Sequence, residues 1–154
     1  MNKYMEIAND LAKENLKDNS GGPFGACIVK NGVIVGKGDN KVLENNDPTA
    51  HAEIEAIRDA SSRLNTYDLS DCELYTTCYP CPMCLSAIIW ANIKKAYVSG
   101  SVKDAEEIGF RDDYIYKFIE GGCADRSVLE IEQMDSKPAK MLYKEYAEMH
   151  KVIY

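Results

Sequence analysis

The sequence predicts an α/β fold, a three-layer α/β/α sandwich around a central mixed sheet. Three observations predict this class: a helical apolar pattern near the N-terminus, a strong β-hairpin signal after it, and alternating strand and helix patterns through the middle of the chain. A hairpin followed by strand–helix units indicates a mixed sheet with helices on both faces. With 154 residues and no visible linker or repeat, the chain is expected to form a single domain over residues 1–154.

The first elements carry the clearest local signals. Residues 3–17 place apolar side chains at the intervals of a helix, and the stretch "DNSGGP" then ends it. The runs "FGACIVK" and "VIVGKG" flank Asn31-Gly32, a dipeptide typical of tight hairpin turns. A polar loop, "DNKVLENND", is expected to follow the hairpin.

The rest of the chain alternates helix and strand patterns. Asp47-Pro48 has the pattern of an N-cap followed by a proline at the first helical position, which predicts a helix from about residue 49 to 62. Pro80 is expected to begin another helix, "CPMCLSAIIWAN". The other expected elements are strands at 72–77 and 94–100, a candidate last strand at 128–133, and a closing helix with a short tail from residue 138.

Composition excludes several classes of function. A net charge of −7 opposes the basic footprint of a free-standing nucleic-acid binder and favours a small neutral substrate. The N-terminal stretch has no long apolar run, so neither a signal peptide nor a membrane span is expected there. We therefore expect a cytoplasmic location. In that compartment six cysteines stay reduced, which favours metal or catalytic use over disulfides.

Three residues near the middle of the chain form a zinc-ligand set. His51 offers an imidazole nitrogen, and Cys81 and Cys84 offer two thiolates, the ligand types that Zn²⁺ binds in tetrahedral geometry. The two cysteines share a face of the expected helix, and the positive end of that helix favours thiolates. Three protein ligands leave a fourth position for water, which is the pattern of a catalytic zinc site.

Glu53 is the candidate catalytic base beside this set. Positions 51 and 53 point apart on an ideal helix, but side chains tilt toward the helix N-terminus, so both can reach a site just beyond that end. Zinc lowers the pKa of bound water to about 7, and Glu53 would take that proton and pass it to a leaving amine. The arrangement H-x-E…P-C-x-x-C matches the signature of zinc-dependent base deaminases. The alternative is a closed structural site in which Cys78 adds a third thiolate.

Four stretches and the last residue resemble the cytidine-deaminase-like superfamily, and within it the bacterial guanine deaminases. The stretches are "GGPFGACIVKNG" (21–32), "NDPTAHAEIEAIR" (46–58), "CYPCPMCLSAIIWA" (78–91) and "GFRDDYIYK" (109–117), and the chain ends in Tyr154. Together they span nearly the whole chain. "PTAHAE" with "PCPMC" indicates the superfamily, whereas "GF-x-D-D-x-x-IY" and the terminal tyrosine point to the guanine deaminases.

This resemblance implies a cytidine-deaminase-like fold and hydrolysis of free guanine to xanthine and ammonia, in purine salvage or catabolism. It implies one zinc ion per subunit, held by the three ligands above, with Glu53 as the proton-shuttling residue. Asp112 matches an aspartate that contacts guanine and takes part in releasing ammonia. The implied substrate-binding residues are Phe24, Asn40, Ala52, Asp112 and Tyr154.

The resemblance also implies a homodimer with exchanged C-terminal segments. Residues from about 135 to 154 would cross to the other subunit, so that Tyr154 serves the partner's site. Two positions depart from the family pattern. Tyr79 stands where the family usually has glutamate, and Arg111 precedes two aspartates, so Asp113 is an alternative to Asp112.

Guanine chemistry independently favours a carboxylate in the pocket. Guanine presents N1–H and its 2-amino group side by side as donors, whereas adenine requires a donor for its N1. Taken without the resemblance, the outer residues have ordinary explanations: Asn40 as a turn residue, Phe24 as core, the two aspartates as helix caps, and a frayed terminal tyrosine. Trp90, on the zinc helix, fits either the core or a pocket wall.

Rival functions stay open at this point. A transfer-RNA adenosine deaminase must bind a polyanion, yet 18 scattered basic residues face 25 acidic ones. Cytosine, guanosine or another amino-bearing base is a second alternative, and a non-catalytic structural zinc domain is a third. The expected partners are therefore a small purine base and a second copy of the chain, with no nucleic acid and no membrane.

Overall fold

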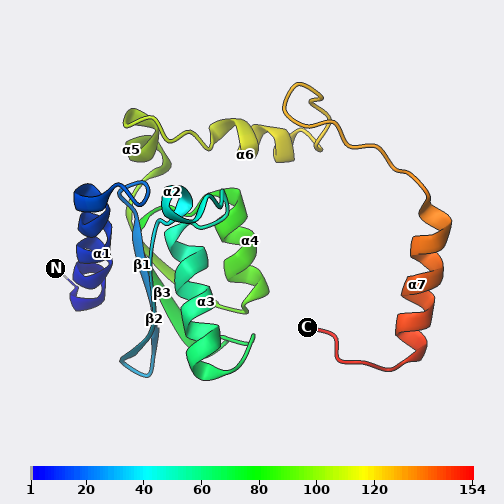
Figure 1. Cartoon of the computed structure of the whole chain (residues 1–154), viewed down its shortest axis with the longest axis horizontal. Helices are drawn as coiled ribbons and strands as arrows, with labels where there is room; N and C mark the ends of the chain where they lie inside the picture. The colour runs from blue at the N-terminus through cyan, green and yellow to red at the C-terminus, as the bar shows by residue number, and fades with distance from the viewer. Residues whose placement is uncertain (1) are drawn as a thin grey trace. The chain divides into compact units, whose positions relative to one another are not determined.

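The computed structural model describes residues 2–154, which fall into two compact units divided between residues 116 and 117. The first unit contains a four-stranded sheet in the order β2-β1-β3-β4 (Figure 1). Its strands are β1 (Gly25–Lys30), β2 (Val33–Asp39), β3 (Cys72–Cys78) and β4 (Lys95–Gly100). β1 pairs antiparallel with β2 and β3, whereas β3 and β4 run parallel, so the sheet is mixed as predicted.

Helix α1 (Lys3–Asp18) covers one face of this sheet. The Asn2 side chain caps its first turn by accepting from the backbone N–H groups of Tyr4 and Met5. Tyr4 and Met5 then pack against the buried β-sheet residues Cys27, Val29 and Tyr75. The predicted helix over 3–17 is therefore confirmed.

Helices α3 (Ala52–Leu64) and α4 (Pro82–Trp90) cover the opposite face, which completes the three predicted layers (Figure 1). Small residues let α3 lie directly on β2. A Cβ atom at Gly38 would stand 2.2 Å from the carbonyl oxygen of Ala52, and one at Gly36 would stand 2.5 Å from that of Ala56. This close approach holds the start of α3 against the sheet.

The hairpin turn forms at the predicted dipeptide. Asn31 and Gly32 both adopt positive φ, 49° and 79°, which is the backbone of a type I′ turn. The expected polar loop after the hairpin differs, since it contains a short helix, α2 (Val42–Asn45). The backbone N–H groups of Leu43 and Glu44 both donate to the carbonyl oxygen of Ser20, which ties α2 to the end of the α1 segment.

Two helices begin later than their proline signals predict. α3 starts at Ala52 rather than at about residue 49, because Asp47 forms a local turn by accepting from both the backbone N–H and the hydroxyl of Thr49. α4 starts at Pro82, and Pro80 lies outside it. In both cases the residue just before the helix is extended, and that residue is a predicted zinc ligand.

The remaining helices are α5 (Val102–Glu107), α6 (Asp113–Glu120) and α7 (Ser136–Glu148). α7 confirms the expected closing helix. The candidate strand at 128–133 is wrong, since these residues form no regular strand and Leu129 and Ile131 are exposed. An alternating pattern makes a strand only where a neighbouring strand completes the ladder. Within residues 2–154, no helix combines the length and apolar character needed to cross a membrane.

Candidate metal centre and active site

The three predicted zinc ligands meet between the N-terminal ends of two helices. His51 is the N-cap of α3 and Cys81 is the N-cap of α4, each with an extended backbone, and neither side chain caps its own helix. Cys84 follows in the first turn of α4 and is fully buried. Both helices therefore direct their positive ends at the site, which stabilises negatively charged ligands.

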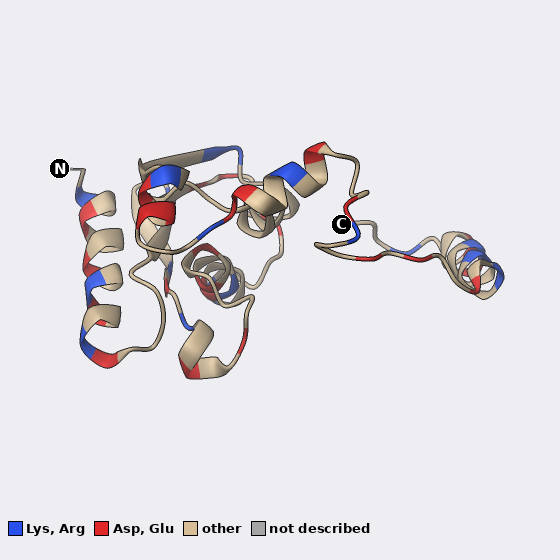
Figure 2. Cartoon of the chain, turned by 90° about the horizontal axis from the view of Figure 1, so that it is seen from above, with Lys and Arg blue, Asp and Glu red and all other residues tan. Residues whose placement is uncertain are grey.

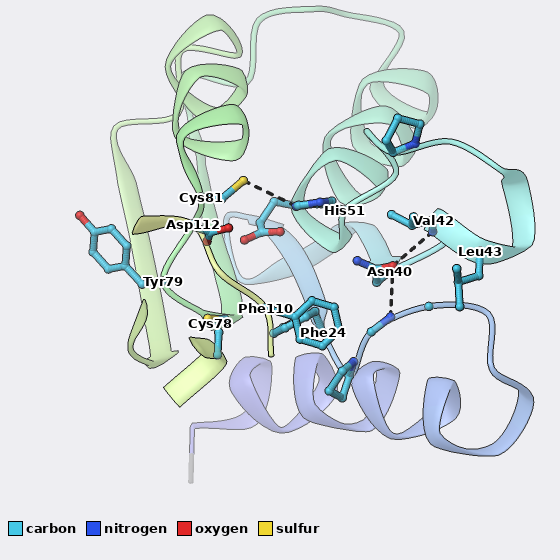
Figure 3. Close-up of a pocket in the computed structure, with 16 residues that line it drawn as sticks. Phe24, Asn40, Val42, Leu43, His51, Cys78, Tyr79, Cys81, Phe110 and Asp112 are labelled. Carbon is cyan, nitrogen blue, oxygen red and sulfur yellow. Dashed lines mark hydrogen bonds between the residues drawn. The ribbon is translucent and has the colours of Figure 1, made fainter. Parts of the chain in front are cut away.

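The spacing of the ligand atoms fits a tetrahedral zinc ion. The Sγ atoms of Cys81 and Cys84 each lie 3.6 Å from Nδ1 of His51. Figure 3 shows the contact between Cys81 and His51. Zinc bonds of about 2.0 Å to nitrogen and 2.3 Å to sulfur would place such ligands about 3.5 Å apart. Among residues 2–154, this is the set of candidate ligand atoms that lie within 4.8 Å of one another. Cys78 is outside it, and its Sγ instead contacts the carbonyl oxygen of Ser101 at 3.6 Å.

Electrostatics in the cluster favour a metal-binding state. The hydrogen bond between the two cysteine sulfurs lowers the pKa of Cys81 well below its ordinary value and raises that of Cys84. One thiolate is therefore already stable beside the imidazole, and a cation would stabilise the second. Cys78, by contrast, has its pKa raised to about 11, chiefly by burial, which favours a neutral thiol there.

Glu53 lies in the first turn of α3 and is 6% exposed. Its Oε1 accepts a hydrogen bond from the Thr76 hydroxyl at 3.2 Å, and its Oε2 lies 3.5 Å from the Cys84 sulfur. Because His51 precedes the helix in an extended conformation, residues 51 and 53 converge without requiring the side-chain tilt that the sequence suggested. Burial raises the pKa of the Glu53 carboxyl, so this group accepts protons more readily than an exposed glutamate.

A pocket of about 470 Å³ opens onto the cluster (Figure 3). This volume lies in the usual range of small-molecule binding sites. Its walls come from the loops before β1, after β2 and before α6, and its lining includes the predicted residues Phe24, Asn40, His51, Glu53, Cys81 and Asp112.

Residues 1–100 match the family model described as the cytidine and deoxycytidylate deaminase zinc-binding region. The matched stretch contains all three zinc ligands and Glu53. The chain belongs to this zinc-dependent deaminase family. It is 49% identical over 125 residues to a protein named guanine deaminase from Bacillus subtilis, which covers 81% of this chain and 80% of the relative.

Structural comparison extends this relation over the whole deaminase chain. An X-ray structure of guanine deaminase from Bacillus subtilis matches with a TM-score of 0.93 and 42% identity, covering 100% of this chain and 99% of that one. A tRNA-specific adenosine deaminase from Aquifex aeolicus is 52% identical over 77 residues, but this covers only 50% of this chain and 51% of the relative. Another relative with this name, from Buchnera aphidicola subsp. Schizaphis graminum, is 42% identical over 107 residues and covers 70% of both chains. These two relatives therefore match a smaller share of the chain than the guanine deaminase does.

Asn40 presents its amide nitrogen to the pocket of this deaminase. The side chain is 4% exposed, and its Oδ1 accepts from the backbone N–H groups of Gly22 at 3.3 Å and Val42 at 3.2 Å. Because both partners are donors, the oxygen must face them and the NH₂ group faces the cavity (Figure 3). Asn40 is thus more than a turn residue.

The two neighbouring aspartates occupy different environments. Asp112 lines the pocket, and burial raises the pKa of its carboxyl. Asp113 is not among the lining residues, and both of its carboxylate oxygens lie 3.1 Å from the Arg111 guanidinium. The placement favours Asp112 over Asp113 as the residue that meets a ligand.

The other predicted site residues, Ala52 and Tyr154, and the undecided Trp90 have different outcomes. The Ala52 side chain is fully buried in the core, so its assignment to substrate binding concerns the backbone and stays a prediction. Tyr154 is 78% exposed and belongs to the unit 117–154, and its role also stays a prediction. Trp90 is 69% exposed and is absent from the pocket lining, so it forms neither core nor wall.

Sequence reasoning missed two residues of the site. Phe110 packs edge-on against Phe24, with ring centroids 4.9 Å apart and planes at 84°, so the two rings make one wall. A Cβ atom at Gly22 would lie within 2.9 Å of both rings, which explains a glycine there. Thr76, which donates to Glu53, alternates inward on β3. The strand pattern in the sequence predicts that Thr76 points inward, but only the structure shows that it faces Glu53.

Proposed function

We propose that this deaminase hydrolyses free guanine to xanthine and ammonia, with one zinc ion per subunit. One observation carries the proposal: the pocket beside the zinc ligands holds a half-buried acceptor, Asp112, and a fixed donor, the Asn40 amide. Guanine carries the complementary groups, because N1–H and the 2-amino group donate while O6 and N7 accept. The relatives named guanine deaminase support the same substrate.

Glu53 carries the protons in the proposed reaction. When bound, zinc would acidify a water molecule and so supply the nucleophile. Glu53 accepts a proton from the water that attacks C2 and delivers it to ring N3. The second water proton goes to the 2-amino group, the C2–N bond breaks, and ammonia leaves as the ring becomes xanthine. Thr76 orients the Glu53 carboxylate for these transfers through its 3.2 Å hydrogen bond.

Asp112 reads the edge of the base on which this chemistry occurs. Its carboxylate would accept from N1–H and from the amino group, which also brings it close to the departing ammonia. Phe24 and Phe110 would flank the ring as an apolar wall. Adenine would leave the carboxylate facing an acceptor nitrogen. A site built to hydrogen-bond its substrate rejects an analogue that leaves its polar groups unpaired by about 10⁴-fold or more.

A transfer-RNA substrate is the second candidate, supported by relatives that match from 50% to 70% of the chain. The charge pattern opposes it. Acidic and basic residues alternate along the helices in Figure 2, and acidic residues outnumber basic ones by 25 to 18. A phosphate backbone is bound by clustered positive charge. We therefore place the enzyme among those acting on a free base, in the reducing cytoplasm that its free cysteines suit.

A substrate panel tests this proposal. The zinc-loaded full-length protein is incubated separately with guanine, guanosine, adenine, cytosine and transfer RNA, and ammonia release is measured with the ultraviolet spectrum of the product. We expect turnover of guanine at least about 100-fold above that of adenine and cytosine. Faster turnover of adenosine in transfer RNA would establish the rival enzyme, and a zinc-replete protein that releases no ammonia from any substrate would establish a non-catalytic zinc domain.

We further propose that residues 1–154 act as one deaminase domain in a homodimer, with the segment from about 135 to 154 exchanged between subunits. None of the described residues 117–154 is buried. The apolar side chains Met141, Leu142 and Tyr143 of α7 are 62–69% exposed, which is unfavourable in water unless another surface covers them. Exchange would bring Tyr154 to the partner's pocket.

Deleting residues 150–154 is expected to lower kcat/KM for guanine by about tenfold or more while zinc content stays at one per chain. The reason is that the deletion removes Tyr154 and leaves the metal ligands intact. Mixed dimers give the sharper measurement. Glu53→Gln chains keep their tails and deleted chains keep Glu53, so re-forming dimers from the two should restore activity. Full activity of the deleted chain as a monomer would contradict the exchange.

A further inference from the structure

A buried asparagine outside the pocket joins the two loops that form one of its walls. Asn15, near the end of α1, is 3% exposed. Its Nδ2 donates to the carbonyl oxygens of Gly22 at 2.8 Å and Asn40 at 2.9 Å, and its Oδ1 accepts from the Ser20 hydroxyl at 2.7 Å. The amide thus uses both of its donors and its acceptor, which leaves it one orientation.

The bonds of Asn15 fix the backbone of Asn40 and one of the two partners of its side chain, Gly22. Asn15 holds the backbone of Asn40 itself and that of Gly22, whose N–H donates to Asn40 Oδ1. Gly21 lies tightly between them, since a Cβ atom there would stand 2.1 Å from Asn40 Oδ1. Small displacements of either loop would therefore move the Asn40 amide.

The consequence reaches the pocket through the free end of that amide. Asn40 Nδ2 donates no hydrogen bond to another of the residues 2–154 that the structure describes, and it points into the cavity (Figure 3). A donor fixed in direction binds its acceptor without losing rotational freedom on binding, whereas a mobile donor does lose it.

We propose that Asn15 is a positioning residue for substrate binding: it sets the direction of the Asn40 amide donor that faces the pocket. This inference depends on the proposed function only for the identity of the ligand, guanine. Asn15 does not line the pocket itself and contacts it only through Gly22 and Asn40. Its effect therefore falls on binding and not on the proton transfers of Glu53. A purely structural role, the closing of α1 onto the first loop, would instead lower stability without changing KM.

The test compares Asn15→Leu with Asn9→Leu. Leucine matches asparagine in shape and removes its polar atoms, and Asn9 lies on the same helix, where its amide donates to the Met5 carbonyl oxygen. For Asn15→Leu we expect KM for guanine to rise about tenfold with kcat within about threefold of the wild type, because the lost interaction is the same in the ground and transition states. Asn9→Leu should keep the wild-type KM.

A double-mutant cycle with Asn40→Ala shows whether Asn15 acts through Asn40. If it does, adding Asn15→Leu to Asn40→Ala raises KM no further. Independent, multiplicative effects of the two changes, or an unchanged KM in Asn15→Leu, would overturn the proposal. Should Asn15→Leu not fold, Ser20→Ala removes only the hydroxyl that orients the Asn15 amide, and a KM rise of about threefold is expected; no rise would count against the role.

A readout without substrate separates this inference from the proposed function. Amide hydrogen exchange of Gly22 and Val42 reports whether Asn40 Oδ1 still holds their N–H groups. In Asn15→Leu both should exchange about tenfold faster while Ile28 in β1 is unchanged. Unchanged hydrogen exchange at Gly22 and Val42 would contradict the positioning role of Asn15 even if guanine is the substrate. Faster exchange would support that role even if another base is the substrate.

Discussion

Glu53→Gln is expected to lower kcat for guanine by about 10³-fold or more while the chain keeps its zinc and its fold. Glutamine has the shape of glutamate and can still accept from the Thr76 hydroxyl, so the packing around this 6% exposed side chain changes little. It cannot take a proton from water and return it to the ring. The loss therefore falls on the chemical step, and KM should change little.

Glu55→Gln is the matched control for this change. Glu55 lies two residues further along the first turn of α3 and pairs with Arg58 at 2.6 Å on the surface of the helix. Its substitution should leave kcat within about twofold, as for most surface changes. Steady-state kinetics, metal analysis and thermal unfolding of the three proteins make the comparison. Retained turnover in Glu53→Gln would end the mechanism proposed above.

Cys84→Ala is expected to remove both zinc and activity. The substitution takes away one of three ligands at a fully buried position, and two remaining ligands hold zinc poorly. Zinc content should fall from one per chain to below about 0.1. The lost binding energy should also lower the free energy of unfolding by about 4 kcal/mol at a zinc concentration about 1,000 times the dissociation constant.

Cys27→Ala provides the control, because Cys27 is equally buried on the other face of the sheet. The substitution also removes a buried sulfur atom. In the wild type, the Cys27 sulfur contacts the carbonyl oxygen of Tyr4 at 3.4 Å and no zinc ligand. Zinc content and turnover should therefore remain at wild-type values. If Cys84→Ala retained stoichiometric zinc, or if Cys27→Ala lost it, the assignment of the metal centre would be wrong.

Local patterns in the sequence predicted the sheet and the zinc ligands, but not the helix starts that hold those ligands. Prolines at 48, 80 and 82 each carry the signal for a first helical position. Only Pro82 occupies it, because Cys81 and His51 must stay extended ahead of their helices to meet each other. That requirement comes from contacts across 30 residues of chain, which a local pattern does not contain.

The pocket walls were harder to predict for the same reason. Phe110 lies in the "GF-x-D-D" pattern, which assigns it no role, and Asn15 lies in no motif. Each acts through contacts with segments more than 20 residues away, with Phe24 in one case and with Asn40 in the other. Asp112 and Asp113 are both aspartates, so the sequence alone does not show which of them faces the ligand. The difference arises from Arg111, which binds Asp113 and leaves Asp112 to face the cavity.

The family match ends at residue 100, whereas Phe110 and Asp112 lie beyond it. On the proposed roles, Phe110 and Asp112 therefore add ligand recognition from outside the stretch that carries the zinc ligands, Glu53 and Asn40. Evolution can then revise one short wall-forming segment without disturbing the hydrolytic apparatus. The sheet and its two ligand-bearing helices would serve as a common scaffold, and a change in the loop before α6 would alter which substrate the enzyme prefers.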